Sequence, residues 1–374
     1  MRGPTVRPIV IAAGGTGGHF FPAEALAAEL VARGQRVVLM TDARSGGLSS
    51  AVFDGREQFV IRGAGVAGRG VWRGVKAVGA LAAGVVQARR ILASLGAGCV
   101  VGFGGYPSVA PVLAARMLRR RRPAVVLAEQ NAVLGRANRF LAQRADVLAL
   151  GFAATALVPS FVRTEVTGNP VRPAIAALAR TSYVAPAGRL RLLVLGGSLG
   201  ARVFSDVVPA ALALLPVALR ERLSVVQQVR AEDLERVRAA YRASGVAAEL
   251  SPFFADVAAR LVAAHLVIAR AGASTVAELA VVGRPAILVP LPGAIDDHQA
   301  ANARALADAS GAWVMAQRTF TPEALAERLA RVLANPVGLA ALAVGARSHA
   351  RADAVVRLAD LVEARMAART GERV

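Results

Sequence analysis

Short, continuously apolar runs alternate with longer alanine-rich stretches along this chain. Nine runs have the length and β-branched content of strands, at 9–13, 37–41, 99–102, 125–128, 147–150, 190–195, 223–228, 266–269 and 286–290. Their apolar residues follow one another without polar alternation, which is typical of strands buried on both faces of a parallel sheet. Helical stretches between them, including 22–33, 203–219 and 274–282, predict repeated strand–helix–strand units.

The pattern divides the chain into two halves. Each half opens with an apolar strand that runs into a glycine turn and a helix, at 9–19 and at 190–201. A length of 374 residues exceeds the size at which one hydrophobic core stops growing, and the prolines of Gly-Asn-Pro-Val-Arg-Pro at 168–173 stop a helix between the halves. We therefore expect an α/β protein of two doubly wound, Rossmann-like lobes, 1–170 and 171–350, with parallel sheets facing a central cleft. The remainder, 351–374, is expected to be a helix that packs back on the first lobe.

The chain is strongly basic. A balance of 45 basic against 25 acidic residues gives a formal charge of +20, and Lys76 is the single lysine among the arginines. Such a surplus predicts attraction to an anionic partner, which could be nucleic acid, a phospholipid surface or a phosphorylated substrate. Aromatic residues make up only 5% of the chain and no nucleic-acid-binding module is recognisable, which argues against nucleic acid.

A mean hydropathy of +0.48 raises the question of a membrane span. The longest uncharged run, 91–115, is interrupted by Gly-Phe-Gly-Gly-Tyr-Pro at 102–107. It therefore predicts a strand, a glycine loop and a helix, whereas a bilayer is crossed by one apolar helix of about 20 residues. The N-terminal apolar stretch is also too short for a signal peptide. These patterns predict a cytoplasmic protein that does not span a membrane, with Cys99 as a buried thiol in a reducing compartment.

Three segments with candidate chemistry follow strands of the first half. Gly-Gly-Thr-Gly-Gly-His at 14–19 lets backbone N–H groups approach an anion beside a helix N-terminus, and ends in His19, which is either structural or functional. Gly-Phe-Gly-Gly-Tyr-Pro at 102–107 forms a plain tight turn or contacts a diphosphate. Glu129, Gln130 and Asn131 either point into the cleft or form a solvated loop with a helix cap.

The second half repeats this arrangement. Gly-Gly-Ser-Leu-Gly at 196–200 is a further glycine turn, and segment 270–278 starts a helix that we expect Ser274 and Thr275 to cap, with free amides for a phosphate. The carboxylate of Glu278, a turn further on, either accepts hydrogen bonds from a ribose diol or only complements the helix dipole. Asp296 and Asp297 match no zinc or magnesium spacing, so no metal is expected.

Seven ordered motifs resemble those of glycosyltransferase family 28: GGTGGH, GFGGYPS, EQN, TGNPVR, GGSLGA, RAGASTVAE and DDHQ. The resemblance runs from Ile9 to Trp313 and is to the members that transfer N-acetylglucosamine from UDP-N-acetylglucosamine to undecaprenyl-diphospho-muramoyl-pentapeptide in peptidoglycan synthesis. It implies a GT-B fold, with an acceptor and membrane lobe before a donor lobe, inversion at the sugar carbon, and neither metal nor cofactor. It also implies a peripheral enzyme on the cytoplasmic face of the cell membrane, with an anionic membrane surface and no nucleic acid as partner.

The resemblance implies donor contacts in the first half and at the hinge that we expect between the halves, at 168–173. Thr16, Gly17 and Gly18 match the glycine loop that contacts the donor diphosphate and sugar from the opposite lobe. Asn131 matches a sugar-contacting asparagine, and Arg172 matches an arginine after the hinge that takes part in nucleotide binding.

Further contacts are implied in the second half. Ser198 matches a phosphate-contacting serine, Phe254 occupies the position whose backbone reads the uracil edge, and Gln299 matches a glutamine that faces the sugar hydroxyls. The matching start of the phosphate-binding helix comprises Ala273, Ser274, Thr275, Val276, Ala277 and Glu278. Within this stretch Glu278 is implied to bind the ribose.

The implied reaction is a direct displacement, in which the acceptor C4 hydroxyl attacks the anomeric carbon and UDP leaves. A base must take the hydroxyl proton, and helix N-termini stabilise the departing diphosphate. His19 is the favoured base and Glu129 the alternative. Two positions depart from the family pattern. Ala128 stands where many relatives have a histidine and cannot transfer a proton, and His298 replaces a glutamine of some relatives, which leaves the sugar-hydroxyl contact open.

Segment 72–92 is the predicted membrane contact. On a helix, one third of the circumference carries Arg73, Lys76, Gln87 and Arg90, and the opposite face carries Val78, Leu81, Val85 and Leu92. This apolar stripe either packs on the first lobe or dips into the bilayer beside Trp72. In the second case Arg69, the basic residues of the helix and the arginine run 119–122 meet anionic head groups.

Two other functions remain open. A different GT-B enzyme, such as a glycolipid transferase or a UDP-sugar 2-epimerase, would share the glycine loops, although the apolar and basic segment after Val66 argues against a soluble-sugar epimerase. A nucleic-acid-binding protein is the less favoured alternative and rests on the charge alone.

Overall fold

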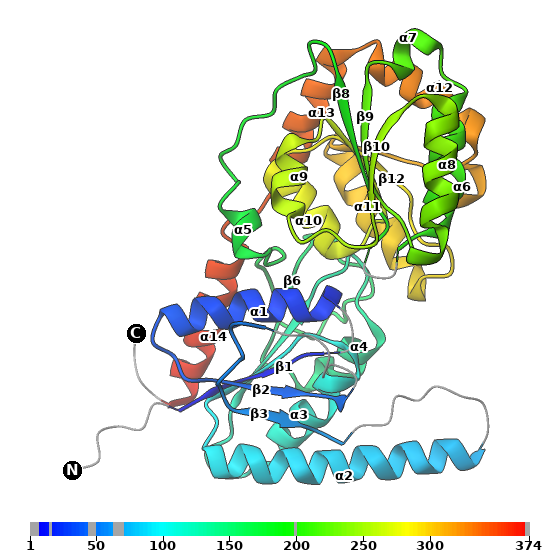
Figure 1. Ribbon diagram of the computed structural model, residues 1–374. Coiled ribbons are helices and arrows are strands. Elements are labelled where there is room, and N and C mark those ends of the chain that lie inside the picture. Colours follow the sequence, from blue (N-terminus) through cyan, green and yellow to red (C-terminus); the bar gives the residue numbers. More distant parts are fainter. Residues whose placement is uncertain (1–6, 15–16, 44–49, 63–70, 198–199, 371–374) are drawn as a thin grey trace. The chain divides into compact units, whose positions relative to one another are not determined.

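The computed structural model describes residues 7–14, 17–43, 50–62, 71–197 and 200–370, with the side chains of 71–76 and 370 left out. The chain forms two compact units (Figure 1). The first lobe comprises Met1–Arg172 and Asp353–Val374, and the second comprises Pro173–Ala352. Each is described by itself below.

The first lobe contains a seven-stranded sheet of order β3-β2-β1-β4-β5-β6-β7 in which every pairing is parallel. The strands are β1 (Ile9–Ala12), β2 (Val37–Thr41), β3 (Gln58–Val60), β4 (Cys99–Gly102), β5 (Ala124–Glu129), β6 (Val147–Leu150) and β7 (Thr164–Val166). The helices are α1 (Gly17–Ala32), α2 (Val71–Leu95), α3 (Gly105–Met117), α4 (Arg136–Leu141) and α14 (Ala354–Thr370). Apolar side chains from both faces of the sheet enter two separate core clusters, as expected when helices cover both faces.

The second lobe contains a six-stranded parallel sheet of order β10-β9-β8-β11-β12-β13. Its strands are β8 (Leu190–Leu195), β9 (Leu223–Gln228), β10 (Ala247–Ser251), β11 (Leu266–Ala269), β12 (Ala286–Leu288) and β13 (Ala312–Val314). Its helices are α5 (Pro173–Ala176), α6 (Arg202–Ala213), α7 (Val217–Arg220), α8 (Leu234–Ser244), α9 (Val257–Ala263), α10 (Ala273–Val282), α11 (His298–Asp308), α12 (Pro322–Leu333) and α13 (Pro336–Ser348). Two Rossmann-like lobes with parallel sheets confirm the predicted fold class.

The nine predicted strands are the inner strands of the two sheets, and the four that the pattern missed are the edges, β3, β7, β10 and β13. β7 and most of β10 are exposed along their length. An edge strand buries little apolar surface, so its sequence lacks the continuous apolar run of a central strand.

Two predicted helices differ by several residues in their bounds. α1 begins at Gly17, within the glycine loop, and not at Pro22, which lies inside the helix. The predicted helix 203–219 is divided into α6 and α7, because Pro216 stands at the N-cap of α7 and cannot continue the preceding helix.

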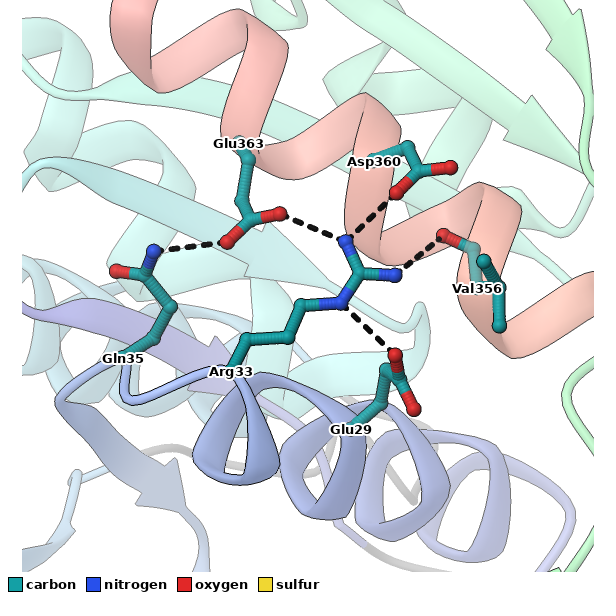
Figure 2. A network of polar contacts seen from close by, with 6 residues as sticks. All are labelled: Glu29, Arg33, Gln35, Val356, Asp360 and Glu363. Carbon is teal, nitrogen blue, oxygen red and sulfur yellow. Dashed lines mark hydrogen bonds and ion pairs between the residues drawn. The ribbon is translucent and has the colours of Figure 1, made fainter.

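The last helix, α14, returns to the first lobe and packs against α1 (Figure 2). The Arg33 guanidinium at the end of α1 lies 2.6 Å from a carboxylate oxygen of Asp360 and 2.7 Å from one of Glu363. It also donates to Glu29 of α1 at 2.8 Å, and Gln35 donates to Glu363 at 2.8 Å. Leu358 and Val362 of α14 join one core cluster of the lobe, so the helix is held by apolar packing as well as by ion pairs.

Helix α2 runs along the outside of the first lobe and packs on α3 (Figure 1). Three members of its predicted apolar stripe, Leu81, Val85 and Leu92, pack into the core of the lobe, so they do not form a bilayer-dipping surface. The fourth, Val78, is 69% exposed. Among the described residues, Ala77–Leu95 is the one helix that is long and apolar enough to cross a membrane. The helices Pro322–Leu333 and Pro336–Ser348 meet the same length and composition criteria only when taken together, and they are sharply bent at their junction. This is weak evidence, because core helices of soluble proteins pass the same test.

Candidate active site

In the first lobe, three loops converge at the carboxyl ends of neighbouring strands. β1, β4 and β5 are adjacent in the sheet, and they lead into α1, α3 and the segment before α4. In an open parallel sheet this edge is where ligands bind. His19 lies in the first turn of α1, Gly104 and Gly105 lie at the start of α3, and Glu129-Gln130-Asn131 lies at the end of β5, so the structure brings these candidates to one edge of the sheet.

His19 stands in the first turn of α1, and its Nδ1 lies 2.9 Å from Oε1 of Gln130. Its ring faces the second glycine loop. A Cβ atom placed on Gly104 would lie 3.6 Å from Cε1 of His19, and one placed on Gly105 would lie 3.8 Å from its Nε2. Both glycines have positive φ, +84° and +64°, so the backbone of this turn favours glycine at each of the two positions.

Glu129 is buried, with 3% of its surface exposed, and its carboxylate is surrounded by donors. Oε1 accepts hydrogen bonds from the backbone N and Nδ2 of Asn131, at 2.9 and 3.1 Å. Oε2 accepts from the backbone N of Gly135 and from Nδ2 of Asn138, both at 2.9 Å. Four bonds match the acceptor capacity of a carboxylate, so Glu129 organises the loop that carries Gln130 and Asn131.

The hinge segment supports the same loop from the other side. Asn169 is buried, and its Nδ2 donates to the backbone O of Gln130 at 2.8 Å. Its side chain lies so close to Gly151 that a Cβ there would be 2.2 Å from Oδ1 of Asn169. The guanidinium of Arg172, which also belongs to the first lobe, lies over the ring of Phe21 of α1, 5.7 Å from the ring centroid.

In the second lobe, the glycine turn after β8 is closely packed. A Cβ on Gly196 would lie 2.4 Å from the backbone N of Ala201, and Gly197 and Gly200 both have positive φ. The side chain of Gln228, at the end of β9, accepts from the backbone N of Gly196 at 3.1 Å. The turn therefore depends on glycine for its shape.

Helix α10 begins directly after β11, and its N-terminus is suited to an anion. Its N-cap is Gly272, with extended backbone, and no described side chain caps it. The prediction that Ser274 and Thr275 cap this helix is therefore wrong, because the helix starts one residue earlier, at Ala273, and includes both. Ser274 Oγ is buried and makes no hydrogen bond within the described part of the chain. Uncapped amides and an unused hydroxyl suit a bound phosphate.

Polar side chains hold the short segment between β11 and α10. Asn302, fully buried, donates to the backbone O of Ala271 at 3.1 Å. Arg270 donates to the backbone O of Val289 at 3.1 Å and to Oε1 of Gln317 at 2.7 Å. Burial lowers the pKa of the Arg270 guanidinium. The cation is nevertheless held by carbonyl and amide oxygens, which stabilise the loop that precedes the helix.

Phe254, His298 and Gln299 of the second lobe lie after other strands, and the remaining described candidates lie on α10 itself. Phe254 is buried, and the guanidinium carbon of Arg260 lies 4.1 Å from the centroid of the Phe254 ring. Oε1 of Gln299 accepts from the backbone N of Leu291 at 3.0 Å. His298, the first residue of α11, hydrogen-bonds the backbone O of Ile295 at 2.8 Å through Nδ1. Ala277 and Glu278 are partly exposed on α10, whereas Val276 of the same helix is buried.

Two predicted contacts, Thr16 and Ser198, lie outside the described residues. The other candidates are divided between the first lobe and the second. Among the residues that the structure describes, no three His, Cys, Asp or Glu side chains are placed to hold a metal ion.

Comparison with known proteins assigns both lobes. The glycosyltransferase family 28 N-terminal domain matches residues 9–149, and the family's C-terminal domain matches residues 191–358. A relative from Granulibacter bethesdensis is 65% identical over 97% of this chain and 94% of its own length, and one from Acidiphilium cryptum is 57% identical over 99% and 100%. The chain belongs to glycosyltransferase family 28. Both relatives are named UDP-N-acetylglucosamine–N-acetylmuramyl-(pentapeptide) pyrophosphoryl-undecaprenol N-acetylglucosamine transferase.

The crystal structure of MurG from Acinetobacter baumannii resembles this family 28 glycosyltransferase in three dimensions. The TM-score is 0.78 at 32% identity, covering 96% of this chain and 99% of that one. The N-terminal family domain includes the whole cluster of His19, Gln130 and Asn138. The C-terminal domain includes the glycine turn at Gly196 and all of α10.

The sequence did not reveal the contacts through which Gln130, Asn138 and Asn169 support this family 28 site. Gln130 and Asn169 stood inside recognised motifs, but their partners, His19 and the Gln130 carbonyl, lie far from them in sequence. Asn138 had no motif at all. It donates to the backbone O of Ala128 at 3.1 Å as well as to Glu129, and this contact follows only from the position of α4.

Proposed function

We propose that this chain catalyses inverting transfer of N-acetylglucosamine from UDP-N-acetylglucosamine to the C4 hydroxyl of undecaprenyl-diphospho-muramoyl-pentapeptide. The observation that carries the proposal is 65% identity, over nearly the full length of both chains, to a relative that bears the name of this transferase. Segment 1–170 serves as the acceptor and membrane lobe and 171–350 as the donor lobe.

The donor diphosphate binds at the start of α10. The uncapped amides after Gly272 and the unused hydroxyl of Ser274 support this position. Glu278 binds the ribose diol, the Phe254 backbone reads the uracil edge, and Gln299 donates to sugar hydroxyls through Nε2, because its Oε1 is taken by Leu291. Ser198, Thr16, Gly17, Gly18, Asn131 and Arg172 complete the donor contacts that the family motifs imply.

His19 is the general base, and Glu129 is not. The Glu129 carboxylate already accepts four hydrogen bonds from its own loop. Protonating it would sacrifice at least one of these bonds inside a buried site. His19, only partly buried, has one ring nitrogen engaged by Gln130. Replacing His19 with Ala is therefore expected to lower turnover by about 10²–10⁴, the usual contribution of a general base, with UDP affinity unchanged.

The first lobe docks peripherally on the cytoplasmic face of an anionic membrane, where the acceptor's polyprenyl tail is anchored. On the described part of α2, the outward face contains the apolar Val78 and Val86 and the basic Arg89 and Arg90, all exposed. Met117 at the end of α3 is a further exposed apolar residue of this lobe, and the arginine run 119–122 adds exposed basic residues. Arg69 and the side chains of Trp72, Arg73 and Lys76 lie outside the described residues.

A transfer assay tests the function directly. Purified protein with UDP-N-acetylglucosamine and the lipid-linked acceptor is expected to release UDP and form the lipid-linked disaccharide, and UDP-glucose is expected to replace the donor poorly. Epimerised N-acetylhexosamine released without acceptor would indicate a 2-epimerase instead. UDP release with no disaccharide under any acceptor condition would contradict the proposal.

A further inference from the structure

Gln130 lies between the candidate base and a backbone carbonyl, and its amide can adopt only one orientation there. The nitrogen Nε2 faces the backbone O of Ala128 at 3.0 Å, and Oε1 faces Nδ1 of His19 at 2.9 Å. Rotating the amide by half a turn would bring two oxygens together, because a carbonyl can only accept hydrogen bonds. The contact with Ala128 therefore decides which atom His19 meets.

The orientation of the amide in turn decides where the imidazole carries its proton. Oε1 of Gln130 has no hydrogen, so Nδ1 of His19 must donate in the 2.9 Å contact. In a neutral imidazole the lone pair is then on Nε2. That nitrogen faces Gly105, where the absence of a Cβ, which would lie 3.8 Å away, leaves space beside it.

We propose that Gln130 is a positioning residue that fixes His19 as the Nδ1–H tautomer, so that Nε2 accepts the proton of the acceptor hydroxyl. The inference rests on the proposed role of His19 as base. In the reaction the C4 oxygen forms a bond to the anomeric carbon, the bond to UDP breaks, and the hydroxyl proton passes to Nε2. His19 then carries both ring protons until it releases one to solvent.

A neutral partner also suits a base. A carboxylate beside Nδ1 would favour the imidazolium form and so raise the pKa of the ring. An amide orients the ring without placing a full negative charge beside Nδ1.

The side chain of Gln130 can be changed without removing the supports of its loop. Its backbone O is held by Asn169 at 2.8 Å, and the rest of the loop is bonded to Glu129. Gln130→Met keeps the length of the side chain and deletes both amide contacts. Gln87→Met is a matched control in the same lobe, because the Gln87 amide likewise bridges two backbone groups, Arg62 N and Val60 O, at 3.0 Å each.

The tautomer can be measured without substrate, by ¹⁵N NMR of histidine-labelled full-length protein. The chain has only four histidines, and the His19→Ala variant identifies the signals of His19. Wild type and Gln87→Met are expected to show Nδ1 protonated and Nε2 unprotonated, and Gln130→Met is expected to show a mixture. A His19 ring protonated at Nε2 in wild type, or an unchanged ring in Gln130→Met, would overturn the proposal.

Kinetics supply the second readout. Gln130→Met is expected to lower kcat at least about tenfold but less than the 10²–10⁴ expected for loss of the base, with the KM for UDP-N-acetylglucosamine unchanged. Gln130→Glu should move the acidic limb of the kcat–pH profile to higher pH and regain activity above it, whereas an unmoved limb would contradict the role. If no transfer is detected but the tautomer responds to Gln130, the proposed function fails and the structural assignment stands.

Discussion

The Arg33 guanidinium lies 2.6 Å from the carboxylate of Asp360, although 327 residues separate them in the chain. The hydrogen bonds that Arg33 donates to Asp360 and also to Glu29 and Glu363 raise its pKa, so the residue stays charged wherever the lobe is folded. Arg33 stands at the end of α1, the helix whose first turn carries His19. The last helix of the chain thus supports the element that presents the candidate base.

Arg33→Met tests the ion pairs that join Arg33 to α14, because it keeps the aliphatic stem and removes the charge. We expect the free energy of opening of α14 to fall by about 1.5–3 kcal/mol, the range for hydrogen bonds to charged groups. Amide hydrogen exchange in α14 would then be roughly tenfold or more faster, since 1.4 kcal/mol is a factor of ten.

The control for the Arg33 variant is Arg357→Met, on α14 itself. Arg357 pairs with Asp353 one turn away, and both side chains are 52% exposed. Such an exposed pair contributes only about 0.3–0.5 kcal/mol, so exchange should hardly change. Equal effects of the two variants would mean that α14 is held by its apolar residues alone.

The sequence predicts what depends on local pattern and misses what depends on distant partners. Central strands such as β4 and β5 are continuous apolar runs, and this pattern predicts every one of them. β7, exposed at all three residues, has no such signal. In the same way the Glu129 motif was visible, but its four-fold bonding requires Gly135 and Asn138 to fold back over it. The helix start at Ala273 was missed by one residue, because the extended conformation of Gly272 is not encoded in any single side chain.

Glu278→Gln tests the donor site on α10. If the carboxylate binds the ribose diol, the variant loses charge-assisted hydrogen bonds worth about 1.5–3 kcal/mol each. UDP and UDP-N-acetylglucosamine should therefore both bind more weakly, by a similar factor, because they share the ribose. Calorimetric titration with each ligand measures this, and an unchanged UDP affinity would remove Glu278 from the nucleotide site.

Gly196→Ala tests the glycine turn after β8. The added Cβ would lie 2.4 Å from the backbone N of Ala201, so the turn must move. Overpacking of this kind costs about 1–3 kcal/mol, and we expect much of it to appear as weaker UDP binding. Gly188→Ala is the matched control, because nothing lies within 4 Å of its Cβ position. If both variants bind UDP like wild type, this turn is not part of the donor site.

The last prediction concerns the membrane and follows from the outward face of α2. Val78 is 69% exposed and Val86 is 47% exposed, and their spacing of about two turns places them on one side of the helix. We expect Val78→Gln with Val86→Gln to weaken co-sedimentation with anionic liposomes. Arg89→Gln with Arg90→Gln should cost about 2 kcal/mol, at roughly 1 kcal/mol per basic residue near an anionic surface.

The two α2 variants should differ in their response to salt. Salt screens charges, so added salt should weaken liposome binding by wild type and by the valine variant but have less effect on the arginine variant. Val344→Gln is the control, because Val344 is 71% exposed on α13 of the second lobe. UDP affinity should be unchanged in all three, because none of these residues belongs to the proposed donor site. Wild-type sedimentation of both α2 variants would place the docking surface elsewhere on the lobe.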